Sequence, residues 1–204
     1  MVKISQIGIL GEFINRFDLT PSSEAPSEPL GNGYAILHQG CEKYVVPLIQ
    51  RKKKTLAITE LTTCGLISDL LTGVSGASQY FLLGVIPYST DAKMELGVSY
   101  SLLTHEGPGT VSHETAQALA NRVRLFSRAD ISLAETGLLS SASLAFKRTA
   151  KAAGTVFLSI VSQGKVHNEV LRVDPDLDRR MMRLEIAGYV LISLYTFLEG
   201  INDP

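Results

Sequence analysis

The segment ITELTTCGLI, residues 58–67, holds an acid, three threonines and a thiol between two apolar runs. An apolar run that stops at Glu60 reads as a strand, and helical spacing begins at about Thr63. Enzymes of the α/β class often place a nucleophile or a phosphate-binding loop at such a strand-to-helix turn. Acyl transfer or phosphate binding is therefore the chemistry expected of this turn, although Leu61 directly follows the acid.

Several side chains in or near this turn are candidate nucleophiles. Cys64 lies near the start of the expected helix, where a thiolate is favoured, and it is the best nucleophile type in the turn. The hydroxyls of Thr62 and Thr63 are the alternatives there. Three further serines read mainly as a polar loop and only secondarily as a displaced nucleophile: Ser140, Ser141 and Ser143.

Neither a metal site nor a nucleic-acid site is expected. His105, in HEGPG, reads as a loop residue, and no pair of histidines has the spacing of metal ligands. No other cofactor is expected. The formal charge is −1, so no basic field attracts nucleic acid, and the run RKKK at residues 51–54 reads as a solvated helix end.

Length and composition favour one globular domain with an appendage. The chain has 204 residues, of which 45% are hydrophobic and 19% charged. Its two cysteines, Cys41 and Cys64, are too few for a disulfide scaffold, which favours a reducing, intracellular compartment. No apolar run reaches the roughly 18 residues of a membrane span. The first residues do not resemble a secretory signal.

Strands alternate with helices along most of the chain. We expect strands over residues 55–60, 80–88 and 129–136, a hairpin of 154–162 with 165–173, and helices over 34–54 (interrupted at Pro47), 63–71, 91–96 (capped by Thr90), 112–126 and from Asp174 onward. This order predicts an α/β fold, a three-layer α/β/α sandwich with a mixed sheet.

Residues 1–30 read as an extension added to a domain of residues 31–204. Ile7, Leu10, Ile14 and Phe17 fall on one face of a short amphipathic helix, and the Pro- and Ser-rich segment LTPSSEAPSEPLGNG reads as a linker. Such a helix packs either on its own domain or on another chain. We therefore expect a homo-oligomer or a protein partner bound through residues 1–30.

The stretch VSGASQYFLLGVIPYSTDAKMELGV, residues 74–98, resembles the signature of the CinA C-terminal domain family. That family comprises nicotinamide mononucleotide deamidases, also called nicotinamide-nucleotide amidases. Three later segments match family motifs in the same order: GTVS at 109–112, AETG at 134–137 and KAAGTV at 151–156. The resemblance covers about residues 34–199 and implies the sandwich fold above, with a pyridine nucleotide as ligand.

The resemblance also implies roles for particular residues. Deamidation of a carboxamide needs a nucleophile, a base, an acid for the leaving ammonia and donors for the oxyanion. Tyr88 and Lys93 stand where the family has the groups that work its serine. Lys93, partly desolvated in a cleft, would have a lowered pKa. The matching positions imply substrate-binding roles for Glu60, Thr62, Gly65, Ser112, Thr136 and Gly137, and a catalytic role for Thr63.

Two departures from the family pattern lie at this site. Leu61 stands where the family has its serine nucleophile, and leucine cannot form an acyl-enzyme. The family's glycine-rich GIAGP loop is GLLSS here, residues 137–141. The sequence therefore favours an inactive homologue that acts as a structural or partner-binding subunit. An amidohydrolase using Thr62, Thr63 or Cys64 is the alternative, and an unrelated enzyme or small-molecule sensor on the same fold is a third reading.

Overall fold

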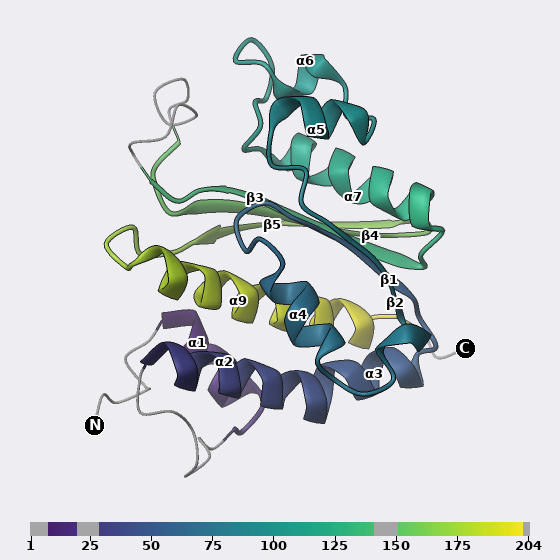
Figure 1. Cartoon of the computed structure of the whole chain (residues 1–204), viewed down its shortest axis with the longest axis vertical. Helices are drawn as coiled ribbons and strands as arrows, with labels where there is room; N and C mark the ends of the chain where they lie inside the picture. The colour runs from purple at the N-terminus through teal and green to yellow at the C-terminus, as the bar shows by residue number, and fades with distance from the viewer. Residues whose placement is uncertain (1–7, 20–28, 141–150, 202–204) are drawn as a thin grey trace.

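A five-stranded mixed sheet forms the middle of the molecule, in the order β2-β1-β3-β4-β5 (Figure 1). The computed structural model describes residues 8–19, 29–140 and 151–201. β1 pairs in parallel with both β2 and β3, whereas β4 runs antiparallel between β3 and β5, as the expected hairpin requires. The strands are β1 (Leu56–Glu60), β2 (Phe81–Val85), β3 (Ile131–Leu138), β4 (Thr155–Ser162) and β5 (Lys165–Arg172).

Helices cover both faces of the sheet, which confirms the three-layer α/β/α sandwich (Figure 1). One face carries α7 (His113–Ser127), with α5 (Thr90–Glu95) and the short α6 (Tyr100–Leu103) beyond it. The other carries α4 (Leu66–Thr72) and α9 (Arg179–Glu199). The central strand β1 is buried throughout, because Ile58 packs toward α9 while Ala57 packs against Val123 of α7.

The longest helix, α9, is mostly buried. Its 21 residues are long and apolar enough to cross a membrane by length and composition, but 67% of the 18-residue window that meets this test is buried inside the protein. A core helix of a globular domain has the same properties. We had expected this helix to start at Asp174. Instead, residues 174–178 form a turn, and Asp178 caps the helix by accepting the main-chain N–H groups of Arg180 and Met181.

The N-terminal segment packs against its own chain. α1 (Gly8–Arg16) lies along α9, and Phe13 is fully buried over Gly40, where any Cβ would lie 2.4 Å from the Phe13 ring. Phe17 is also buried, and Arg16 forms an ion pair with Glu199 at 2.8 Å. The predicted contact of Ile7 and most of the predicted linker lie outside the described residues. A role of residues 1–30 in assembly stays a prediction.

Pro47 widens the next helix without ending it. The helical stretch continues through α2 (Pro29–Gly40), a π-helical turn η2 (Cys41–Val45) and α3 (Val46–Arg51). Proline has no N–H to donate, so one hydrogen bond of a regular helix is missing here. The N–H of Val46 reaches back to the carbonyl of Cys41, which is the spacing of a π turn.

Two helix caps lie beside the polar turn. Ser112 opens α7 as expected, because its side chain accepts the N–H of Thr115 at 3.1 Å. The expected cap at Thr90 is wrong by one residue: Ser89 accepts the N–H of Ala92 at 3.1 Å, and Thr90 is the first residue of α5.

Candidate functional site

The polar turn joins β1 to α4 at the carboxyl edge of the parallel strands. Cys64 and Gly65 both adopt left-handed backbone angles, with φ of 52° and 97°, and together they reverse the chain within five residues. Glycine adopts this conformation easily, whereas cysteine does so at some cost in free energy. The Cys64 thiol donates to the carbonyl of Leu61 at 3.4 Å.

The side chain of Glu60 caps the N-terminus of α4. Its buried carboxylate accepts the main-chain N–H groups of Gly65 at 2.9 Å, Ile67 at 3.0 Å and Ser68 at 2.8 Å, and the Ser68 hydroxyl at 2.5 Å. These are the groups that a phosphate or a thiolate would use at a helix start. Glu60 therefore occupies the predicted phosphate-binding site, and it lines neither of the two cavities described below.

A second buried acid, Glu135 on β3, occupies the turn itself. Its Oε1 atom accepts the main-chain N–H groups of Leu61, Thr62 and Thr63, each at 2.9 Å. The hydroxyl of Thr62 bonds to Oε2, and that of Thr63 lies 2.8 Å from Oε1. Complete burial raises the pKa of Glu135, and the hydrogen bonds from Thr62 and Thr63 act against that shift.

Glu135 lies within the AETG motif at residues 134–137, and the sequence alone assigns no role to it. The available signal was an acid inside the otherwise buried strand ISLAETGL. A buried carboxylate needs several donors to be tolerated, and the turn supplies them. The two elements are 72 to 74 residues apart in the chain, so only the fold brings them together.

Thr63 lies between both carboxyl groups. Its hydroxyl is 2.7 Å from Oε2 of Glu60 and 2.8 Å from Oε1 of Glu135. A hydroxyl carries one proton and cannot donate to two carboxylates at once. The Thr63 hydroxyl therefore donates to one of the two carboxyl groups at a time.

On the α7 side of the turn lies a cavity of about 200 Å³, here called the Lys93 cavity. It brings together six of the predicted site residues from four separate segments: Leu61, Thr62, Tyr88, Lys93, Thr136 and Gly137. Its remaining lining residues include Thr110, Leu138, Leu139, Ser140 and Arg179. Typical pockets for small molecules measure about 300–1,000 Å³, so this cavity is small.

Lys93 extends from α5 into this cavity. Its side chain is 4% exposed, and its Nζ donates to the main-chain carbonyls of Tyr88 at 2.8 Å and Ser89 at 3.3 Å. Burial lowers the pKa of Lys93 to about 8, as we expected from the sequence. No hydroxyl bonds to Nζ among the described residues, so the amine has no nucleophile to activate directly.

Three other predicted residues shape the walls of the Lys93 cavity. Tyr88 is 61% exposed, in the loop after β2, and its hydroxyl lies 3.4 Å from a guanidinium nitrogen of Arg179. The Thr136 hydroxyl donates to the carbonyl of Thr110 at 2.8 Å. Gly137 has no room for a Cβ, which would lie 2.8 Å from the Thr62 methyl group.

Leu61 lines the Lys93 cavity on the side of the turn. Its side chain is 7% exposed and packs in a cluster with Val98, Leu103 and Leu119 on the α7 side of the sheet. Leu138 and Leu139 add apolar surface from the end of β3. The wall of the Lys93 cavity is therefore apolar at the position where the resemblance implies a nucleophile.

The remaining candidates lie elsewhere. Thr63, Cys64 and Gly65 face a different cavity on the α9 side of the turn, and Ser112 serves as the cap of α7. His105 is exposed in the turn after α6, which agrees with its reading as a loop residue. Within residues 8–19, 29–140 and 151–201, no group of three His, Cys, Asp or Glu side chains could hold a metal ion. Ser141 and Ser143 lie outside the described residues.

A family model and the curated relatives of this chain point to the same protein family. The model of the CinA C-terminal domain matches residues 38–198. A protein from Thermoanaerobacter pseudethanolicus described as competence-damage inducible is 36% identical over 170 residues, which cover 83% of this chain and 40% of that protein. A CinA-like protein from Thermotoga maritima is 33% identical over 168 residues, 82% and 39% of the two chains. The chain thus spans about two fifths of the length of these curated relatives.

Solved structures show the same fold. A CinA superfamily protein from Klebsiella pneumoniae superposes with a TM-score of 0.73 at 19% identity, covering 81% of this chain and 99% of that one. A competence/damage inducible protein from Agrobacterium tumefaciens has a TM-score of 0.65 at 26% identity, with coverage of 78% and 94%. On the family match and these relatives, the chain belongs to the CinA C-terminal domain family.

Proposed function

We propose that this chain is a CinA-family domain that has lost serine-based amide hydrolysis and acts as a binding or assembly subunit. One observation carries the proposal: the groups that would do the chemistry are already used. Leu61 fills the nucleophile position, and the N–H groups of Leu61, Thr62 and Thr63, which could stabilise an oxyanion, all donate to Glu135.

The size of the Lys93 cavity supports the same proposal. A space of about 200 Å³ is below the usual range for nucleotide-sized ligands, and Leu138 and Leu139 line it in place of glycines. A pyridine nucleotide would bind there only if these side chains moved. The assembly role through residues 1–30 and an intracellular location, inferred from two free cysteines, belong to this proposal as well.

Ammonia release from nicotinamide mononucleotide tests the proposal. Purified wild-type protein is expected to release none above the blank. Activity that appears only in Leu61→Ser, whose new hydroxyl would face the cavity that Lys93 lines, would support the proposal. Lys93→Ala and Leu61→Ser/Lys93→Ala are the matched controls. Wild-type turnover that disappears in Lys93→Ala would overturn the proposal. A silent Leu61→Ser variant that is folded would implicate Leu138 and Leu139.

One observation favours a second candidate, an amidohydrolase that uses Thr62. Its hydroxyl bonds to the Glu135 carboxyl, a group able to accept its proton, and Thr62 lines the same cavity as Lys93. In that case the Thr62 hydroxyl would pass its proton to Glu135 as its oxygen bonds to the carboxamide carbon. The C–N bond would then break, the nitrogen would take up that proton and leave as ammonia, and water would hydrolyse the resulting Thr62 ester. Thr62→Val would then abolish ammonia release, whereas Thr62→Ser would retain it.

A further inference from the structure

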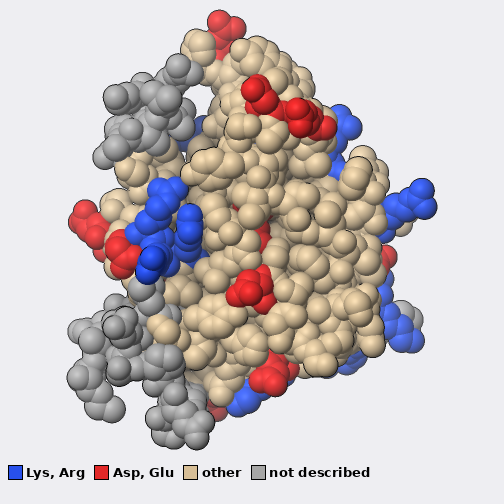
Figure 2. All heavy atoms as spheres, in the orientation of Figure 1, with Lys and Arg blue, Asp and Glu red and all other residues tan. Residues whose placement is uncertain are grey.

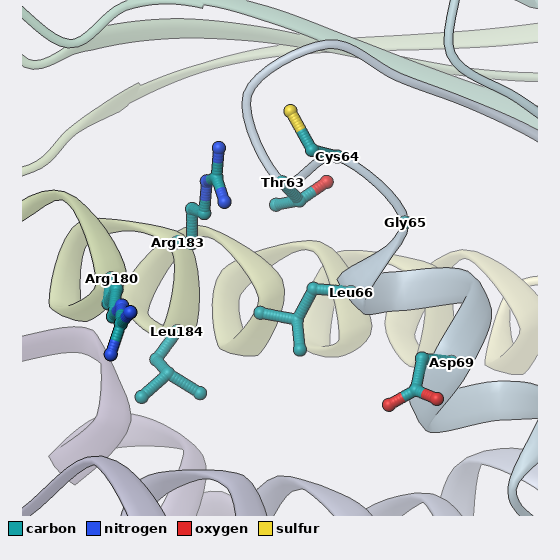
Figure 3. Close-up of a pocket in the computed structure, with 8 residues that line it drawn as sticks. All are labelled: Thr63, Cys64, Gly65, Leu66, Asp69, Arg180, Arg183 and Leu184. Atoms are coloured by element: carbon teal, nitrogen blue, oxygen red, sulfur yellow. The ribbon is translucent and has the colours of Figure 1, made fainter.

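A second cavity lies on the α9 side of the polar turn, here called the Arg183 cavity (Figure 3). Its volume is about 490 Å³, within the usual range for small-molecule pockets. It shares no lining residue with the Lys93 cavity. Its walls are Thr63, Cys64, Gly65 and Leu66 from the turn and the start of α4, Asp69 farther along α4, and Arg180, Arg183 and Leu184 from α9.

Arg183 is held in place and keeps unused donors. Its Nε donates to the carbonyl of Thr62 at 3.1 Å, which fixes the plane of the guanidinium beside the turn (Figure 3). A guanidinium has five N–H donors in a fork that matches a phosphate or a carboxylate. Within residues 8–19, 29–140 and 151–201, Arg183 makes no other hydrogen bond or ion pair, so its remaining N–H groups are open to a ligand.

Three arginines lie at the start of α9, directly after the acidic residue that caps the helix. Arg179, Arg180 and Arg183 fall within its first two turns, where the helix dipole is also positive, and the first turn holds no acidic residue. Figure 2 shows basic side chains gathered at the end of the molecule where α9 begins, with acidic side chains directly beside them. None of the three forms an ion pair among the described residues, although Asp178 caps the helix just before them.

The carboxylate in the wall of the Arg183 cavity does not neutralise these arginines. Asp69 accepts the hydroxyl of Tyr34 at 2.7 Å, and it lies at the opposite end of the cavity from Arg180 and Arg183 (Figure 3). The main-chain N–H groups at the start of α4 are also used, since Glu60 accepts them. An anion in this cavity would therefore be held by the arginines and not by the helix start.

We propose that the Arg183 cavity binds a small phosphate monoester, with its dianionic group on Arg180 and Arg183. Its apolar part would lie against Leu66 and Leu184, whose side chains point into the same space (Figure 3). Two guanidinium groups favour a doubly charged phosphate over a singly charged carboxylate, because each of them can pair with an anionic oxygen. This inference does not depend on serine chemistry or on the Lys93 cavity, so it stands or falls separately from the proposed function.

Titration with inorganic phosphate at constant ionic strength tests the proposal. Phosphate is expected to shift the Gly65 amide and Arg183 Nε signals in NMR spectra in a saturable way. Arg180→Ala is expected to weaken this binding at least about tenfold, the loss of one charge-assisted contact. Arg183→Lys is expected to weaken it as well, because it keeps the charge and loses the fork. The Arg180 side chain makes no hydrogen bond to the part of the chain that the structure describes, so Arg180→Ala should fold normally.

Three controls decide between the outcomes. Arg51→Ala removes an exposed arginine on α3 and is expected to leave phosphate binding unchanged. Lys93→Ala is expected to leave it unchanged too, whereas a loss there but not in Arg180→Ala would move the anion to the Lys93 cavity and overturn the proposal. Equal weakening by Arg51→Ala would mean general charge attraction. Acetate that binds as tightly as phosphate would exclude the phosphate class.

Discussion

Glu135 on β3 and Thr63 in the turn after β1 are joined twice. The main-chain N–H of Thr63 donates to Oε1 of Glu135 at 2.9 Å, and its hydroxyl lies 2.8 Å from the same atom. With Leu61 and Thr62 bonded to that carboxyl group as well, one buried side chain holds the whole turn. The turn that would carry chemistry in an amidase is thus part of the internal structure of this protein.

Replacing Glu135 should loosen the turn. Glu135→Gln puts an amide N–H₂ where main-chain N–H groups need an acceptor, so we expect the free energy of unfolding to fall by about 1–3 kcal/mol. Because burial raises the folded-state pKa of Glu135 above 4.5, its favourable contribution is complete below pH 4.5 and declines as the pH rises. Urea unfolding of both proteins across that range measures the difference. A difference that grows with pH would mean that the hydrogen bonds keep Glu135 ionised.

Shortening Leu61 should cost stability. Leu61→Ala removes buried hydrocarbon from the cluster with Val98 and Leu103, so the free energy of unfolding should drop by about 2–5 kcal/mol. Leu61→Met, which keeps the volume, should cost less than about 1.5 kcal/mol. Chemical denaturation of the two variants compares them. Equal stability of wild type and Leu61→Ala would show that Leu61 belongs to the cavity wall and adds nothing to the core.

Lys93 should make stability depend on alkaline pH. Its pKa is about 8 when folded and 10.5 as the reference value, so the unfolded chain binds the extra proton between these values. Wild-type stability relative to Lys93→Met should therefore rise from pH 8 to 10.5, by at most about 1.4 kcal/mol per pH unit. Thermal unfolding over this range measures the rise. A flat difference would mean that Nζ is well solvated.

The N-terminal segment should contribute to the stability of the domain. Phe13 is fully buried over Gly40, so Phe13→Ala should lower the free energy of unfolding by about 3–5 kcal/mol. Phe126→Ala is the matched control, because Phe126 is 77% exposed and should change little. If Phe13→Ala were as stable as Phe126→Ala, α1 would not be docked in solution. Size-exclusion chromatography with and without residues 1–30 then tests the predicted oligomer.

Gly137 should tolerate no side chain. A Cβ there would lie 2.7 Å from a Val156 methyl group and 2.8 Å from the Thr62 methyl group. We expect Gly137→Ala to cost about 1–3 kcal/mol in unfolding free energy, through displacement of the turn. In a Val156→Ala background part of that cost should disappear, which a double-mutant cycle measures. Independent effects of the two substitutions would place the strain elsewhere.

The order of strands and helices and the fold class followed from the sequence, as did the presence of Leu61 directly after Glu60. Strand alternation and helical spacing are local properties, so β3, β4, β5 and α7 lie within two residues of their expected bounds. Two helix starts differ from the predicted ones. Ser89 and not Thr90 caps α5, and α9 begins after Asp178. Both runs contain several polar residues that could serve as the cap, so the sequence does not single one out. The motif positions of Lys93 and Tyr88 also led to one cavity.

The hydrogen-bond partners of the polar groups in the turn became known from the fold alone. Glu60 and Glu135 take the N–H groups that the sequence offers to a ligand, and Thr63 and Gly65 face α9 instead of Lys93. The gathering of Arg180 and Arg183 beside that turn likewise joins segments more than 100 residues apart. Hydrogen-bond partners at such separations are set by the packing of β1, β3 and α9, which no local pattern encodes.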